Sequence, residues 1–311
     1  MNKISIVGAG MTGATTAHWL AERELADLVL VDVVEGMPQG KGLDLLEAMP
    51  IIGKDVKISG ANDYTATNAS DIIIITAGLP RKPGMSRDDL LSANAAIVGT
   101  AATETLKHSP DAIYIVLTNP LDTMAYLTMK KTGLPRERVI GQAGILDSAR
   151  MRAFVALETG VSVENIDCYV LGGHGDEMVP LTRHSNIAGI SLKEYLPADT
   201  LEAIVARTRK GGGEIVNLLK TGSAFYAPSA ACAQMAEAIL KNKHLIVPCA
   251  AYMNGEYGLK DMFFGVPVML GRTGMEKIIE YKLDEDEKPM FDKSAAAVKE
   301  THEALKNLVK F

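Results

Sequence analysis

The sequence predicts an α/β protein in which a doubly wound parallel sheet of six strands is followed by a mixed α+β domain. Short β-branched runs recur between residues 3 and 140 and alternate with helical patterns. Two of these runs, Ile72–Thr76 and Ile113–Leu117, are apolar without polar alternation, as is typical of parallel strands covered on both faces. The alternation ends after about Gly141. We therefore expect one domain at residues 1–143 and a second at residues 144–311.

Composition and charge exclude several classes of protein. The chain has 311 residues, 47% hydrophobic content and a net charge of −6, which is typical of a globular protein and argues against general nucleic-acid binding. No run approaches the roughly 18 apolar residues of a membrane span, and no signal peptide is expected. The three cysteines, Cys168, Cys232 and Cys249, form no CxxC and no cluster with metal-ligand spacing. We expect reduced thiols, no metal site, no membrane contact and a cytoplasmic location.

A glycine-rich turn follows the first predicted strand, Lys3–Val7. The residues of this turn are Gly8, Ala9, Gly10, Met11, Thr12 and Gly13. Ala14–Glu24 then has the apolar spacing of a helix, and the strand Leu28–Val31 ends in Asp32. This order of strand, G-x-G-x-x-G, helix, strand and acid is the Rossmann dinucleotide-binding pattern.

Each glycine of this pattern has a mechanical reason. Gly8 permits the tight turn, Gly10 lets the backbone approach a pyrophosphate, and Gly13 lets the helix pack close to the sheet. The helix N-terminus supplies N–H groups to the phosphates. Asp32 can accept hydrogen bonds from ribose hydroxyls and would repel a 2′-phosphate, which favours NAD over NADP. The alternatives are FAD and a glycine-rich turn that binds nothing.

Four further strands and two helices complete the predicted first domain. The strands are Val56–Gly60, Ile72–Thr76, Ile113–Leu117 and Arg138–Ile140, and the helices are Met85–Leu106 and Leu121–Lys131. In open α/β sheets, ligands bind at loops that follow the carboxyl ends of strands. One such loop, Ala77–Arg87, contains two prolines, two glycines and three cations. We interpret it as a lid that closes on an anion, the alternative being an ordinary basic surface loop.

Two more polar positions stand near this edge. Asn94 lies seven residues after Arg87 and therefore shares its helix face. Asn119 follows the strand Ile113–Leu117 and precedes a proline, although it could also be a turn or cap residue.

In the second half, one histidine is set apart by its surroundings. The predicted strand Ile166–Leu171 breaks into Gly-Gly-His174-Gly-Asp before a second strand, Met178–Thr182. Glycines let the backbone approach a ligand closely, and imidazole titrates near neutral pH, so His174 is a candidate acid–base residue. Asp147 and Arg150 lie on one face of a helix that ends near Gly160. A local ion pair is the alternative for these two residues.

The remaining elements are helical or extended. We expect helices at Ala198–Leu219, interrupted by three glycines, at Ser229–Lys241 and at Ser294–Phe311. The glycines indicate a kink or close helix packing. Strands are expected at His244–Met253 and Gly265–Leu270, and Met275–Leu283 fits either a helix or a strand.

Taken together, these motifs resemble the lactate/malate dehydrogenase family over essentially the whole chain. The motifs are Gly8–Gly13, Asp32, Ala77–Arg87, Thr118-Asn119-Pro120, Leu146–Arg150 and Gly172–Asp176, in the family's order. The resemblance implies an NAD-dependent enzyme that oxidises a 2-hydroxy acid. Length and overall pattern are similar to the malate-specific members that stand nearest to lactate dehydrogenases.

The resemblance also implies roles for residues. His174 would be the proton donor and acceptor, and Asp147 would orient it. The implied substrate contacts are Arg150 on the carboxylate, Arg87 on the reacting carbonyl and Asn119 near the reacting oxygen. The implied cofactor contacts are Gly8–Gly13, Asp32, Asn94, Leu117, Thr118 and Asn119. Association into a homodimer or homotetramer is implied as well.

Arg81 is the residue that would choose the substrate. In this family its position meets the variable end of the substrate, and the resemblance implies that an arginine there pairs the second carboxylate of oxaloacetate. With pyruvate, the closed lid would bury this charge without a partner, at a cost of about 10³-fold in discrimination. The open alternatives are lactate or another 2-hydroxy acid as substrate, and a dinucleotide-binding sensor without catalysis.

Overall fold

The computed structural model of the chain describes residues 2–80 and 87–309. Six parallel strands form the first part of the sheet, in the order β6-β5-β4-β1-β2-β3. They are β1 (Lys3–Val7), β2 (Asp27–Val31), β3 (Ile58–Ala61), β4 (Ile72–Ile75), β5 (Ile113–Val116) and β6 (Val139–Gly141). Successive strands are added on one side of β1 up to β3 and on its other side from β4 onward, so the switch point of this doubly wound fold lies between β1 and β4. The predicted fold class is confirmed.

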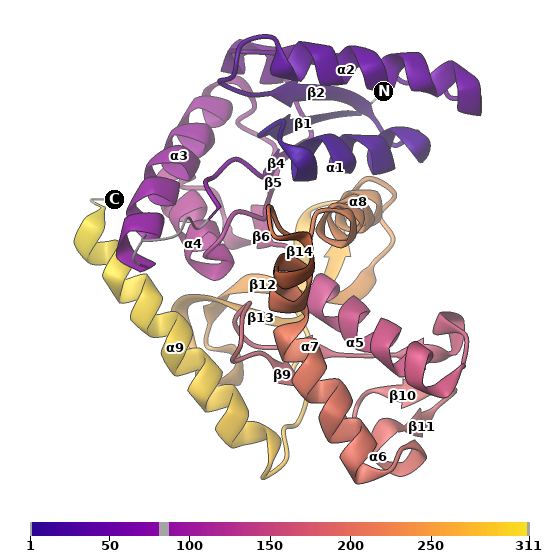
Figure 1. Ribbon diagram of the computed structural model, residues 1–311. Helices are drawn as coiled ribbons and strands as arrows, with labels where there is room; N and C mark the ends of the chain where they lie inside the picture. The colour runs from indigo at the N-terminus through magenta and orange to yellow at the C-terminus, as the bar shows by residue number, and fades with distance from the viewer. Residues whose placement is uncertain (1, 81–86, 310–311) are drawn as a thin grey trace.

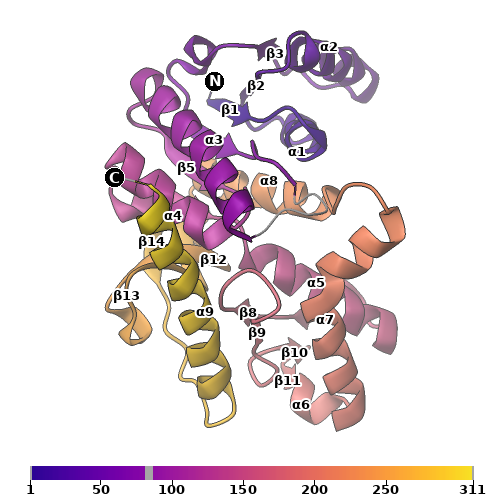
Figure 2. The ribbon, with the colours of Figure 1, turned by 60° about the vertical axis from the view of Figure 1, so that its left-hand side comes forward.

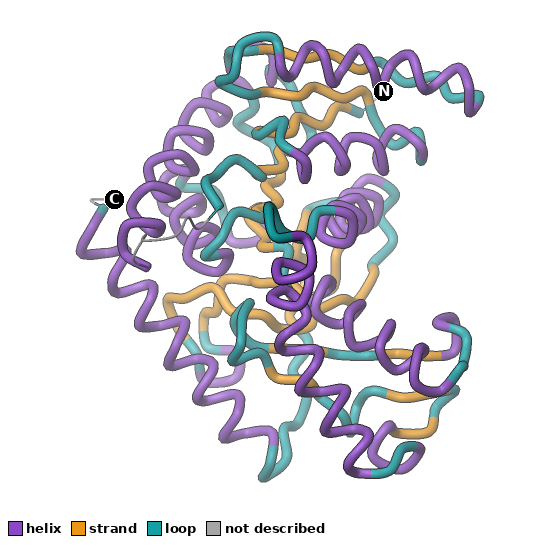
Figure 3. Tube along the Cα trace, in the orientation of Figure 1, coloured by secondary structure: helices purple, strands orange, loops and turns teal. Residues whose placement is uncertain are grey.

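Both faces of this sheet are covered, which explains its unbroken apolar runs. Along β4, Ile72 and Ile74 belong to one hydrophobic core, and Ile73 and Ile75 to the other. All four side chains have 0% exposed area. The first core includes α1 (Met11–Glu22) and α8 (Tyr226–Leu240), and the second includes α3 (Arg87–His108) and α4 (Leu121–Thr132). Figures 1 and 3 show the strands in the middle of the molecule with helices on either side.

The sheet continues into the second half of the chain, which the sequence does not reveal. Three antiparallel strands extend it to nine, in the order β14-β13-β12-β6 at this edge. They are β12 (Leu245–Asn254), β13 (Lys260–Gly271) and β14 (Gly274–Ile278). β12 pairs with β6 at Ala250 and Gly141. A Cβ atom added to Gly141 would lie 2.8 Å from the Ala250 Cβ, so the small residues permit this close approach.

Most of the other helices and strands lie in the lower part of the molecule in Figure 1, whereas α2 lies at its top. The helices are α2 (Met37–Ala48), α5 (Gly144–Thr159), α6 (Leu192–Tyr195), α7 (Ala198–Leu219) and α9 (Glu287–Leu308). The short strands are β7 (Ile166–Asp167), β8 (Val170–Leu171), β9 (Val179–Pro180), β10 (Asn186–Ile187) and β11 (Ile190–Ser191). The 3₁₀ turns are η1 (Met49–Ile52), η2 (Tyr64–Thr67), η3 (Arg136–Arg138), η4 (Val163–Asn165) and η5 (Glu256–Gly258).

The structure corrects three of the sequence expectations. The single strand expected at Ile166–Leu171 is two short strands in different sheets, because β7 pairs with β10 whereas β8 pairs with β9. The helix α7 runs without interruption through its three glycines, of which Gly211 and Gly212 pack against Arg150 of α5, whereas Gly213 faces open space. The C-terminal helix begins at Glu287 rather than at Ser294. The helix α2 was not predicted at all.

None of the helices within the described residues combines the length and the apolar character needed to cross a membrane.

Candidate active site

The glycine turn between β1 and α1 has the shape of a phosphate cradle. Gly8 has a φ of +103°, and a Cβ on Gly13 would lie only 1.8 Å from the Gly8 carbonyl oxygen. Both positions therefore exclude any side chain. Around Gly10, by contrast, an added Cβ would meet nothing within 4 Å. Gly10 is also the N-cap of α1, and no described side chain caps that helix end, so its first N–H groups have no side-chain acceptor.

The carboxylate of Asp32 stands at the end of β2 beside this turn. Its Oδ2 accepts the Ala9 N–H at 2.7 Å, and its Oδ1 accepts the Val34 N–H at 3.0 Å. Asp32 thus holds the turn while remaining only half-buried, where it can also meet ribose hydroxyls. The open cradle and the acid fit a dinucleotide such as NAD.

Lys41 is a contact of this turn that the sequence analysis missed. It extends from α2, and its Nζ donates to the Ala9 carbonyl oxygen at 2.7 Å. The two peptide groups that flank the Ala9 Cα are therefore held by an acid at the N–H and by a base at the carbonyl oxygen. Because α2 was not predicted, no local pattern could place Lys41 near the turn.

Asn94 joins the two loops at the carboxyl ends of β4 and β5. Its side chain is 1% exposed. Its Oδ1 accepts the Leu79 N–H at 2.8 Å, and its Nδ2 donates to the Asn119 carbonyl oxygen at 2.7 Å. Nearby, the Thr118 hydroxyl donates to the Ala77 carbonyl oxygen at 2.7 Å. Asn94 and Thr118 thus fix the loops that hold Leu117 and Asn119.

The structure brings His174, Asp147 and Arg150 together below this edge. His174 lies in the turn between β8 and β9, and the other two lie in the first turns of α5. His174 Nδ1 lies 2.8 Å from Asp147 Oδ2, and an Arg150 terminal nitrogen lies 3.0 Å from Asp147 Oδ1. The side chain of Asp147 is only 3% exposed. The alternative of a purely local ion pair is therefore incomplete, because Asp147 also holds the imidazole.

The contact with Asp147 determines the direction in which the pKa of His174 shifts. Burial alone would lower the pKa of the imidazole, but the charge and the hydrogen bond of Asp147 outweigh it, so the pKa is raised above 6.5. With Nδ1–H directed at the carboxylate, Nε2 is the nitrogen that can exchange a proton with a ligand.

Arg150 has N–H donors that Asp147 does not use. One terminal nitrogen binds Asp147, whereas the buried Nε has no hydrogen-bond partner within residues 2–80 and 87–309. A Cβ on Gly211 of α7 would lie 3.2 Å from the Arg150 Cδ, so the glycines of α7 make room for this side chain. A guanidinium with free donors is suited to a carboxylate.

The lid arginines can be followed only in part. Arg81 falls among residues 81–86, outside the described residues. Arg87 is the first residue of α3, and its side chain is outside the description as well.

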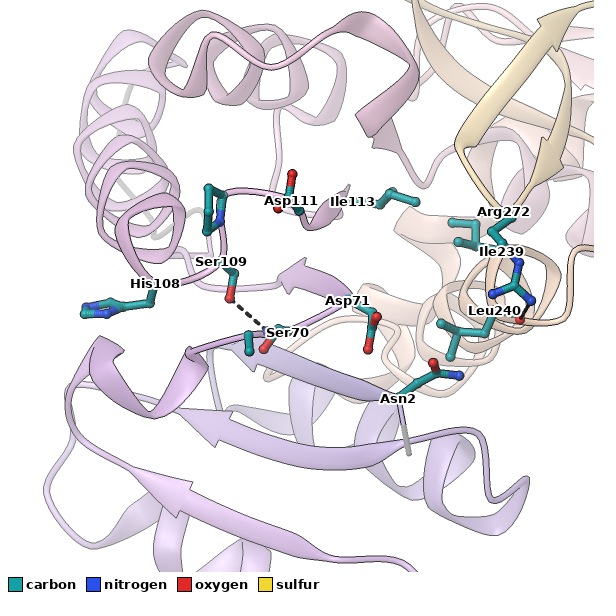
Figure 4. Close-up of a pocket in the computed structure, with 12 residues that line it drawn as sticks. Asn2, Ser70, Asp71, His108, Ser109, Asp111, Ile113, Ile239, Leu240 and Arg272 are labelled. Carbon is teal, nitrogen blue, oxygen red and sulfur yellow. Dashed lines mark hydrogen bonds between the residues drawn. The ribbon is translucent and has the colours of Figure 1, made fainter.

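The cavity in Figure 4 lies away from this chemistry. It has a volume of about 430 Å³ and is lined by residues such as Asn2, Asp71 and Ile113, which stand at the amino ends of β1, β4 and β5. His174 and Asn119 belong to the opposite edge. Among the described residues, no group of three or more His, Cys, Asp or Glu side chains could hold a metal ion.

Comparisons with known proteins agree with this geometry. Residues 2–141 match the lactate/malate dehydrogenase NAD-binding domain, and residues 145–309 match the α/β C-terminal domain of the same enzymes. The chain belongs to the lactate/malate dehydrogenase family. Its N-terminal part is the NAD-binding domain of that family, and its cofactor is NAD.

Relatives within the lactate/malate dehydrogenase family include both activities. A malate dehydrogenase of Roseiflexus sp. (strain RS-1) is 58% identical, with 98% of each chain covered. A solved malate dehydrogenase of Picrophilus torridus in its apo form is 46% identical with a TM-score of 0.96, covering 99% of this chain and 98% of that one. A lactate dehydrogenase of Cryptosporidium parvum, solved with lactic acid and nicotinamide adenine dinucleotide, is 40% identical with a TM-score of 0.95 over 98% of each chain.

Substitution by alanine should impair a different property at each of two glycines of the cradle, Gly10 and Gly13. In Gly10→Ala the methyl group has space in the free protein but projects where a pyrophosphate must approach. We expect an unchanged melting temperature and NADH binding weakened about tenfold or more. In Gly13→Ala the methyl group meets the Gly8 carbonyl oxygen, so the melting temperature itself should fall. Fluorescence titration with NADH and thermal melts measure both, and tight NADH binding by Gly10→Ala would contradict the cradle.

Proposed function

We propose that the chain is a malate dehydrogenase, which catalyses the reversible oxidation of (S)-malate to oxaloacetate with NAD. The observation that carries this is the His174–Asp147 pair beside Arg150, at the sheet edge that the dinucleotide cradle also faces. The names of the relatives at 55–58% identity, all malate dehydrogenases, support it. Lactate dehydrogenases among the similar structures make lactate the second candidate, at lower sequence identity.

Proton transfer at His174 follows from the geometry. When bound, NAD supplies the hydride acceptor, and NADH the donor. In the direction of malate oxidation, neutral Nε2 of His174 accepts the proton of the substrate hydroxyl. Asp147 then stabilises the imidazolium, because its carboxylate holds Nδ1–H at 2.8 Å. In the reverse direction the same Nε2 returns the proton to the reacting oxygen.

The remaining roles concern substrate orientation. Arg150 binds the carboxylate next to the reacting carbon through the donors that Asp147 leaves free. Asn119, which is exposed at the end of β5, donates a hydrogen bond near the reacting oxygen. Arg87 at the start of α3 polarises the carbonyl when the lid closes.

We propose that residues 1–143 form the NAD-binding domain and residues 144–311 the substrate-binding and catalytic domain. The support is chemical as well as topological. The cradle and Asp32 belong to the first range, whereas Asp147, Arg150 and His174 belong to the second. Reaction requires the two to meet, and the pairing of β12 with β6 joins the two ranges in one sheet.

An assay of NADH oxidation separates this proposal from a non-catalytic sensor. The test uses a panel of 2-keto acids near neutral pH, with NADH and NADPH in turn. Malate dehydrogenase activity requires turnover of oxaloacetate with NADH well above that of pyruvate. Tight NADH binding without any turnover would instead favour the sensor.

Arg81 provides a test of substrate choice. We expect Arg81→Gln to lower kcat/KM for oxaloacetate by about 10³-fold, since the second carboxylate loses its charged partner. The kcat/KM for pyruvate should rise or stay constant. Lys82→Gln, at the neighbouring cation of the same loop, is the matched control and should leave the preference in place. An oxaloacetate preference that persists in Arg81→Gln would exclude Arg81 as the selecting residue.

Self-association into a homodimer or homotetramer and a cytoplasmic location complete the proposal. The support for association is an apolar surface on and beside α2. Its members are Leu43 (56% exposed), Leu46 (38%), Ile51 (86%) and Ile52 (47%). Clustered exposure of such large apolar side chains is characteristic of protein–protein contacts.

A charge on this surface should separate the subunits. We expect Leu43→Asp to reduce the mass measured by size-exclusion chromatography with light scattering, because it places a carboxylate in an apolar contact. Leu308→Asp is the matched control, since Leu308 is a similarly exposed helix residue (47%) on α9. A monomeric parent protein, or equal masses for all three proteins, would refute the contact.

A further inference from the structure

The turn that carries His174 is fixed by three successive main-chain N–H groups. Gly172 N–H donates to the Gly265 carbonyl oxygen of β13 at 2.8 Å. Gly173 N–H donates to Ser294 Oγ of α9 at 3.0 Å, and His174 N–H donates to Asp122 Oδ2 of α4 at 3.0 Å. Figure 2 shows α9 passing beside the β8–β9 turn. The main chain at His174 is therefore held from three different elements.

Asp122 differs from the other two partners because it can carry a charge. Its side chain is buried, with 5% exposed area. Its second oxygen, Oδ1, is buried without a hydrogen-bond partner in the described part of the chain. A buried carboxyl that satisfies only one oxygen is costly to ionise. Burial raises the pKa of Asp122 to about 6, although the N–H and the charge of His174 oppose the increase.

The imidazole of His174 thus stands between two carboxyls. Asp147 holds the ring from α5, and Asp122 holds the main chain from α4. Both raise the pKa of the imidazole, whereas burial and the charge of Arg150 lower it. Asp147, Arg150 and Asp122 are the charged groups with the largest effects on the pKa of His174. On the side of α9, Gly172 and Gly173 of the turn meet the neutral Ser294 and Val298. Farther along the turn, Glu177 pairs with Lys293 of α9 at 2.9 Å.

Asp122 also connects the catalytic turn to the substrate loop. It lies three residues after Asn119, in the first turn of α4. The Asn119 carbonyl oxygen is in turn held by Asn94. A continuous set of contacts therefore runs from the loops of the NAD-binding domain to the backbone of His174. Asp122 is the only ionisable side chain among the direct main-chain partners of the turn named above.

We propose that Asp122 is a positioning residue for His174, which fixes the main chain of the catalytic turn and, through its negative charge, favours the protonated imidazole. Asp122 does not touch the reacting atoms, and Asp147 remains the partner of the ring. This inference rests on the proposed role of His174 as the acid–base residue. In this proposal, the role of Asp122 depends on its negative charge as well as on its hydrogen bond to the His174 N–H.

Three variants separate charge from position. Asp122→Asn keeps an oxygen that can accept the His174 N–H but removes the charge. Asp122→Ala removes both. Ser294→Ala removes the neighbouring hydrogen bond to Gly173 without any change of charge. Asp111→Asn is the control, because Asp111 is an exposed carboxylate (92%) at the amino end of β5.

The first measurement uses the full-length protein without substrate or cofactor. Diethyl pyrocarbonate modifies neutral imidazole, and peptide mass spectrometry follows its rate at His174 as a function of pH. We expect the midpoint to shift to lower pH by about half a unit or more in Asp122→Asn, since a charge that favours protonation is lost. Ser294→Ala and Asp111→Asn should keep the parent midpoint. Equal midpoints in the parent and Asp122→Asn, or an equal shift in Ser294→Ala, would overturn the role of the charge.

The second measurement is steady-state reduction of oxaloacetate across pH. Because the reaction in this direction requires protonated His174, the decline of kcat/KM at high pH should begin at lower pH in Asp122→Asn. We expect Asp122→Ala to lower kcat about tenfold or more at every pH, since the turn is released. Thermal melts verify that each variant is folded. Full kcat in a folded Asp122→Ala would overturn the positioning role. A labelling shift in a protein without turnover would refute the malate dehydrogenase proposal but not the coupling to Asp122.

Discussion

The buried hydrogen bond between His174 and Asp147 is the constraint on which the active edge depends. It spans 2.8 Å between two residues that are 27 positions apart in the chain. To form it, α5 must begin directly after β6, and the turn after β8 must approach the start of that helix. The bond sets the imidazole tautomer and raises the pKa of His174. One contact therefore determines which nitrogen exchanges the proton and how strongly the imidazole holds it.

Several glycines in the second half of the chain lie where backbones must approach closely for the His174–Asp147 hydrogen bond to form. A Cβ on Gly265 would lie 2.2 Å from the Gly172 carbonyl oxygen, and one on Gly173 would lie 2.3 Å from a Val298 methyl group. The backbone of the catalytic turn therefore lies directly on β13 and α9. In α7, Gly211 leaves space for Arg150. Because these glycines have no side chains, the backbones approach closely enough for His174, Asp147 and Arg150 to meet.

The charges at this edge form an ordered set. Arg150 and a protonated His174 present positive charge to an anionic substrate, and Asp147 stands behind both. Asp122 adds a second negative group deeper in the protein, on the main chain of His174. The substrate side of the site is therefore cationic, whereas the protein side is anionic. This polarity suits the binding of a carboxylate and the stabilisation of an imidazolium in the same small space.

Local patterns sufficed for the features that depend on local sequence. The glycine turn, Asp32 and the six parallel strands could be predicted because each has a recognisable pattern within a short stretch of sequence. His174 could be proposed from its glycine context. The roles of Asp147 and Arg150 came from the resemblance to the lactate/malate dehydrogenase family, because their helix spacing alone also fits a local ion pair. The pairing of β12 with β6 and the contacts of Lys41 and Asp122 could not be predicted, because each depends on a partner far away in sequence. A lone Asp in the first turn of a helix has the pattern of an ordinary N-terminal acid.

The most direct test of the central claim is the pH dependence of oxaloacetate reduction in the parent protein and in Asp147→Asn. The parent should lose kcat/KM at high pH with a midpoint above 6.5, because Asp147 holds the His174 imidazole in its protonated form. In Asp147→Asn the midpoint should move down by about one unit or more, and kcat should fall by about 10²-fold or more. An unchanged midpoint and an unchanged kcat in a folded Asp147→Asn would contradict the account.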